Sequence, residues 1–129
     1  MLDYSLFQYE WQKNADLVMC NVNLEKIVFS DDCSISFHFL NSYDGEFYKK
    51  ITCNNVWKFT QENGFGKEER FPLFICEVRI FNINKTDIAE AFDIIGYGFS
   101  IPGSDTHYLL CMDSGDVSIK LICGSVIVR

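Results

Sequence analysis

Two histidines, His38 and His107, are the residues of this sequence best suited to chemistry near neutral pH. They occupy matching places in two similar stretches, so a pseudo-symmetric fold could bring them together. Cys53 or Cys111 could then complete a soft metal site. The alternative is two half-exposed strand histidines on opposite parts of the sheet, and we favour that interpretation. We therefore assign no metal ligand and expect no cofactor.

Cys111 would need an activating base to act as a nucleophile, and His107 precedes it by four residues. On a strand this spacing puts both side chains on one face, but too far apart for a direct hydrogen bond. The sequence also lacks a Gly-x-Ser-x-Gly elbow, a glycine-rich phosphate-binding loop, a His-Glu-x-x-His motif and a Cys-x-x-Cys motif. We therefore predict that the protein is not an enzyme.

Two pairs of carboxylates are close enough in sequence to suggest acid–base chemistry, Asp31 with Asp32 and Asp113 with Asp116. Both pairs fall where the chain is expected to reverse, and Asp is favoured there because its side chain bonds the nearby backbone. Acid–base catalysis needs a buried carboxyl group with a shifted pKa, which the tip of a turn seldom provides. We interpret both pairs as turn residues and predict no catalytic residue.

The candidate histidines lie in two stretches with a strand-turn-strand pattern, 38–56 and 107–126. When these are aligned with a gap of one residue in the loop, the turn glycine, the acid after it, a lysine, a cysteine and a valine coincide. The glycines, Gly45 and Gly115, can take the positive φ that a tight reversal needs. The sequence therefore predicts a duplicated β-hairpin unit.

Further strands and one helix complete the predicted fold. Alternating apolar residues predict strands over 17–30 and 33–39. The run over 71–83 has apolar residues at both odd and even positions, which predicts a central strand buried on both faces. Between 86 and 95, Thr86 can cap a helix whose apolar side chains recur with helical spacing. The predicted fold class is α+β and β-rich: a curved, mainly antiparallel sheet, open or barrel-like, of about six to nine strands, with one principal helix at about 86–95.

The composition fits a single domain over residues 1–129 that keeps its cysteines reduced. The sequence is 48% hydrophobic with 2 prolines, so one core is expected and no linker is evident. The six cysteines stand singly inside apolar, strand-like runs, as small core residues do. The first lysine is Lys13, so a basic secretory start is absent, and no apolar run approaches the length of a membrane span. We expect a cytoplasmic protein with free thiols.

The net charge of −7 lies almost entirely in the first third of the sequence, because residues 1–48 contain eight acidic residues against two lysines. A negative field of this kind disfavours binding to nucleic acid or to an anionic membrane, and it favours a basic partner. Solubility alone is the alternative explanation of the charge.

These observations favour a small, acidic, cytosolic protein-interaction module. Its sharpest form is an immunity or antitoxin-type protein that binds and neutralises a basic toxin domain, for example a nuclease. Tyr and Trp side chains near the acidic third are candidate contacts, because such side chains carry much of the binding energy of interfaces. The candidate partner-binding residues are Asp31, Asp32, Asp44, Glu46, Glu10, Glu25, Tyr4, Tyr9 and Trp11.

Two other functions fit the same sequence. A small-ligand-binding, barrel-like domain without catalytic activity would hold its ligand in a mostly apolar pocket inside the curved sheet, with the loop at 64–66 over it. The less favoured alternative is an enzyme whose site carries no recognisable motif. Such an enzyme would show polar groups with perturbed pKa values converging in that pocket.

Overall fold

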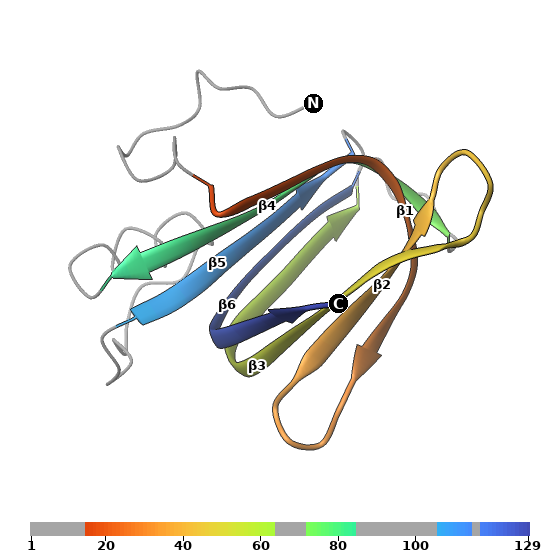
Figure 1. The fold of residues 1–129 in the computed structure, drawn as a ribbon. Coiled ribbons are helices and arrows are strands. Elements are labelled where there is room, and N and C mark those ends of the chain that lie inside the picture. Colours follow the sequence, from red (N-terminus) through yellow and green to blue (C-terminus); the bar gives the residue numbers. More distant parts are fainter. Residues whose placement is uncertain (1–14, 64–71, 85–105, 115–116) are drawn as a thin grey trace.

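The described residues of the computed structural model, 15–63, 72–84, 106–114 and 117–129, form a closed β-barrel. Its strands are β1 (Leu17–Phe29), β2 (Ile35–Asn41), β3 (Phe47–Asn63), β4 (Leu73–Asn84), β5 (Thr106–Asp113) and β6 (Val117–Val128). Their order around the barrel is β1-β2-β3-β6-β5-β4, and the sheet closes between β4 and β1. Figure 1 shows the strands wrapping around a common interior.

The barrel consists of two three-stranded meanders, β1-β2-β3 and β4-β5-β6, in which successive strands are antiparallel neighbours. The meanders join along β3 with β6 and along β1 with β4, again antiparallel. Every one of the six strands is paired on both sides, so none of them presents an open edge. A sheet closed in this way buries its inner face against itself.

The predicted α+β fold class is wrong, because the described residues form an all-β, six-stranded antiparallel barrel without a helix. The segment with the helical pattern, 86–95, lies outside the described residues. The prediction of a curved antiparallel sheet is confirmed. The error has a physical cause: apolar periodicity reports a local preference, whereas the fold class depends on what covers the buried face of the sheet. Here the barrel's own opposite wall covers it.

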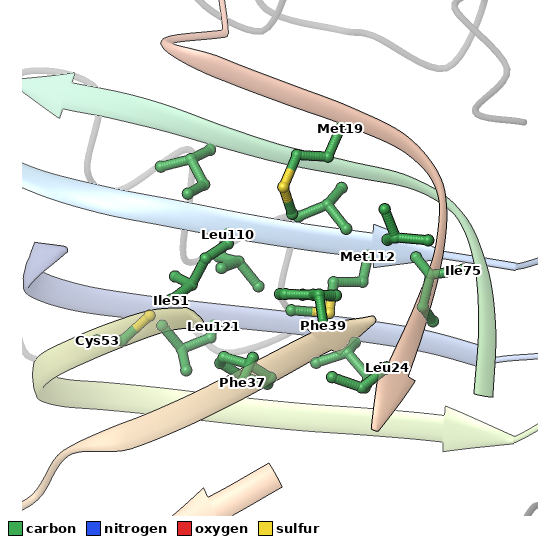
Figure 2. Close-up of a cluster of buried hydrophobic side chains, with 14 of the residues drawn as sticks. Met19, Leu24, Phe37, Phe39, Ile51, Cys53, Ile75, Leu110, Met112 and Leu121 are labelled. Atoms are coloured by element: carbon green, nitrogen blue, oxygen red, sulfur yellow. The ribbon is translucent and has the colours of Figure 1, made fainter. Parts of the chain in front are cut away.

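Buried apolar side chains from all six strands fill the barrel (Figure 2). On β2, Phe37 and Phe39 are fully buried while His38 between them lies on the outer face, as the two-residue period of a strand requires. The interior residues are Met19, Val22, Leu24, Ile35, Phe37, Phe39, Ile51, Cys53, Leu73, Ile75, Val78, Ile80, Leu110, Met112, Val117, Ile119, Leu121 and Cys123. Burial of these side chains supplies most of the drive to close the sheet.

The register between β3 and β6 leaves the predicted duplication untested, and Gly115, one of its two turn glycines, lies outside the described residues. Cys53 lies opposite Val126, and Val56 lies opposite Cys123. The two pairs exchange under a two-fold rotation if Cys53 corresponds to Cys123 and Val56 to Val126, but any two antiparallel strands have this property, whichever residues are aligned. Both aligned stretches are β-hairpins, which confirms that part of the prediction.

The match between the two histidines of the aligned hairpins does not persist in the register. Lys50 lies opposite His38, but its counterpart Lys120 lies opposite Cys111. Cys111, and not His107, therefore stands where His38 stands in the first hairpin. The histidine alignment is therefore a coincidence of residue type, and the duplication stays a prediction.

The expected location of the protein was argued from reduced cysteines and from the absence of a membrane span. All six cysteines are free thiols, which confirms the prediction made from their spacing. Cys53 and Cys123 are fully buried in the core, as small apolar residues are. Within the described ranges, no helix has the length and apolar character to cross a membrane. The cytoplasmic location stays a prediction.

Candidate functional site

The two histidines lie on strands that are not neighbours, His38 on β2 and His107 on β5. His107 is buried and its ring stands edge-on to Trp57 at 6.4 Å between centroids. Burial lowers the pKa of His107, which favours its neutral form. The prediction of separate strand histidines is confirmed, but the expectation that both are half-exposed is wrong for His107. Among the residues that the structure describes, no group of three His, Cys, Asp or Glu side chains is arranged to hold a metal ion.

The surroundings of Cys111 disfavour the thiolate that a cysteine nucleophile requires. Burial raises the pKa of its thiol to about 12, and Asp113 adds to that effect. Lys120 and Arg79, which lie opposite Cys111 on the neighbouring strands, lower the pKa by less. The thiol therefore stays protonated, whereas catalysis by cysteine requires the thiolate.

The predicted acidic residues occupy two separate turns. Asp31 and Asp32 lie between β1 and β2, whereas Asp44 and Glu46 lie between β2 and β3, at the other end of β2 (Figure 1). All four are exposed. Asp32 accepts a hydrogen bond of 2.5 Å from the Ser34 hydroxyl, so part of its role is to hold the turn. Glu25 is exposed on β1, and the remaining candidates, Tyr4, Tyr9, Glu10 and Trp11, lie outside the described residues.

The β2–β3 turn is held by its own hydrogen bonds. The Asn41 side chain accepts from the Tyr43 backbone N–H at 2.8 Å, and the Asp44 carboxylate accepts from the Glu46 N–H at 2.9 Å. The Gly45 N–H donates to the Asn41 carbonyl at 2.9 Å, and Gly45 has a φ of +73°. These bonds fix the direction in which the turn presents its side chains.

Large aromatic side chains are exposed on and beside this turn. Tyr43 is 97% exposed and Phe47 is 60% exposed. Phe47 on β3 pairs with Leu40 on β2, and Leu40 pairs with Asn23 on β1. Asn23 pairs in turn with Phe74 on β4, which is 50% exposed. Residues that are direct partners share one face of a sheet, so these four residues form a continuous outer row across four strands. We call Tyr43, Asp44, Glu46 and Phe47 the turn surface.

The interior of the barrel offers little support for the ligand-binding alternative. Side chains from every strand occupy the space that an internal ligand would need, and Phe37, Phe39, Ile51, Leu110 and Met112 are all within 1% of full burial (Figure 2). A ligand site in a barrel of this kind requires small side chains or a wider wall.

The exposed aromatic residues Tyr43, Phe47 and Phe74 were not among the candidates predicted from the sequence. Phe74 lies in a run with apolar residues at both odd and even positions, so the sequence does not show which face of the strand is outside. Tyr43 had a usable signal, because an aromatic residue directly before an Asp-Gly turn has little opportunity to enter the core.

Comparison with known proteins places the chain in a family. A protein-family model whose description consists only of the suffix "-like" matches residues 17–129. The chain belongs to that family. The match covers all six strands, and the family description names no activity, substrate or partner.

A solved structure shares the barrel. It is the crystal structure of an uncharacterized protein from Neisseria gonorrhoeae, which matches with a TM-score of 0.60 at 21% sequence identity, over 88% of this chain and 95% of that chain. At this identity the likeness shows the fold alone. No curated protein matches the sequence.

Proposed function

We propose that this protein is a non-catalytic protein-interaction module that binds a basic partner through the turn surface. In its sharpest form it is an immunity or antitoxin-type protein that neutralises a basic toxin domain, such as a nuclease. The observation that carries the proposal is the exposure of Tyr43 (97%) and Phe47 (60%) on either side of Asp44 and Glu46. A contiguous patch of exposed apolar side chains is a common mark of an interaction site, whereas single exposed apolar residues are normal.

The turn surface combines the two contributions that a tight interface needs. The aromatic rings offer a large contact area, and aromatic residues are enriched among those that dominate binding energy. Asp44 and Glu46 supply negative charge beside the rings, which would accelerate association with a basic partner and select against acidic ones. Because hydrogen bonds inside the turn already fix its backbone, little conformational entropy is lost on binding.

The second acidic turn, with Asp31 and Asp32, is too distant to belong to the same contact. β2 has 7 residues, which at about 3.4 Å each separates the two turns by roughly 24 Å. The Debye length is about 8 Å at physiological salt, so charges in one turn are largely screened at the other. The proposal therefore assigns the direct contact to Asp44 and Glu46, and leaves Asp31 and Asp32 as a matched control pair.

The test is a binding measurement with a partner captured from an extract of the source organism. The captured protein should be basic, and purified partner should bind wild type with an affinity that falls as salt rises. Asp44→Asn with Glu46→Gln should slow association and flatten the salt dependence. Tyr43→Ala with Phe47→Ala should weaken binding by about 2 kcal/mol or more, mainly through faster dissociation.

Asp31→Asn with Asp32→Asn removes the same number of charges from the opposite turn and should leave binding nearly unchanged. Equal losses from both acidic pairs would mean that only the overall charge matters, and the turn surface would lose its assignment. An acidic partner would contradict the proposal directly. If the partner is a nuclease, stoichiometric addition of this protein should abolish its activity.

A further inference from the structure

Four basic side chains stand in one cross-strand row on the outer face of the first meander and β6. Lys26 on β1 lies opposite His38 on β2, and His38 lies opposite Lys50 on β3. Lys50 and Arg129 exchange two backbone hydrogen bonds, each of 2.9 Å, which places Arg129 directly opposite Lys50 at the end of β6. We call these four residues the basic row.

All members of the basic row lie on the outer face. Phe37 and Phe39, on either side of His38, are fully buried, and Ile51, next to Lys50, is fully buried as well. Because side chains alternate across a strand, His38 and Lys50 must point away from the core. Direct partners on adjacent strands have Cβ atoms about 4.5–5.5 Å apart, so Lys26, His38 and Lys50 lie close together.

The row is unfavourable for a free protein of this composition. The chain has 11 Lys and Arg residues against 18 acids, yet three of those cations and a histidine stand in register on four consecutive strands. Like charges directly opposite each other on a sheet are destabilising. The pKa of His38 is lowered by burial and then by Lys26 and Lys50, while Glu25 acts in the opposite direction. The two lysines therefore act on the imidazole between them.

We propose that Lys26, His38 and Lys50, flanked by Arg129, form a binding site for a tetrahedral oxyanion of the phosphate or sulfate class. Lysine ammonium groups on flexible stems can converge from both sides on an anion placed over the imidazole. Such an anion offsets the repulsion within the row and accepts charge-assisted hydrogen bonds from each cation. The site is separate from the turn surface and does not rest on the proposed protein partner.

The chemistry gives the site a pH dependence with a defined sign. Lys26 from β1 and Lys50 from β3 oppose protonation of His38, and Glu25 from β1 favours it. A bound anion adds negative charge beside the imidazole, so it raises the pKa of His38. By linkage, the anion then binds more tightly as pH falls through that pKa. Sulfate keeps its charge across this range, whereas phosphate itself titrates, so sulfate isolates the contribution of His38.

The experiment is an NMR titration of the two histidine rings in the full chain with sulfate, phosphate and chloride at one ionic strength. We expect saturable shifts of the His38 signals with sulfate and phosphate, a raised His38 pKa relative to chloride, and unchanged His107 signals. Lys26→Gln and Lys50→Gln should each weaken sulfate binding by about tenfold, the effect of losing one charge-assisted hydrogen bond. Tighter binding of phosphate than of sulfate would assign the natural ligand to the phosphate class, and the reverse order to the sulfate class.

Lys120→Gln is the matched control, because Lys120 lies on β6 opposite Cys111, away from the row. It should retain sulfate binding. Linear, non-saturating shifts equal to those in chloride would overturn the site, and so would a loss in Lys120→Gln as large as in Lys50→Gln. Thermal unfolding of each variant guards against a folding artefact. Removing Lys26 or Lys50 relieves repulsion, so the midpoint without added anion should stay the same or rise.

Discussion

The same substitution at two phenylalanines of neighbouring strands should separate stability from function. Phe37 on β2 is fully buried, and Phe47 on β3 is 60% exposed. Phe37→Ala removes a full core side chain and leaves a cavity, which costs about 3–5 kcal/mol. Phe47 buries only the remaining two fifths of its surface. Full burial of such a side chain contributes about 1.5–3 kcal/mol, so the contribution of Phe47 is about 1 kcal/mol.

Urea unfolding followed by circular dichroism measures both effects, with the slope compared to confirm that the unfolded state is unchanged. A domain of this size has a total stability of about 5–15 kcal/mol, so Phe37→Ala should lower the midpoint strongly or prevent folding. Phe47→Ala should fold with nearly the wild-type midpoint and lose partner binding. If Phe47→Ala destabilises as much as Phe37→Ala, then Phe47 is a packing residue and the turn surface is misassigned. A cost below about 1 kcal/mol for Phe37→Ala would mean that the barrel interior is not filled as described.

Three further predictions concern the pairing of β3 with β6 and the thiol of Cys111. A Cβ at Gly124 would lie 3.2 Å from the Cβ of Asn55, and Asn55 has a φ of +55°. Gly124→Ala should therefore destabilise the protein by about 1 kcal/mol. In a double-mutant cycle measured by urea unfolding, Asn55→Gly should suppress that loss. Additive effects of the two substitutions would contradict the close approach of the two residues. At pH 7, iodoacetamide should modify exposed Cys20 and spare Cys111 in native protein, as judged by mass spectrometry of peptides, because the pKa of Cys111 is raised to about 12. Since this folded-state value lies above the ordinary 9.0, unfolding releases the Cys111 proton between the two values, and stability should fall as pH rises from about 9 to about 12.

The strands and turns were predictable because their causes are local. Alternation over Ile35–Asn41 and the Asp-Gly pair at 44–45 identify β2 and the turn that follows it. Closure of the barrel was not predictable in this way, because it depends on β1 meeting β4 and β3 meeting β6 across long separations in sequence.

The candidate site shows why charge summed along the sequence is an incomplete guide to charge on a surface. Asp31, Asp32, Asp44 and Glu46, four of the acidic residues of the first third, lie in the turns at the two ends of β2, and the outer face between those turns carries Lys26, His38 and Lys50. Strand register makes residues far apart in sequence direct neighbours on the surface. A net charge summed over a window of the sequence does not record such neighbours. A basic partner meeting the turn surface would therefore find attraction at the β2–β3 turn and repulsion from the adjoining basic row. That gradient fixes how such a partner can approach, and an anion bound to the row would weaken the repulsion.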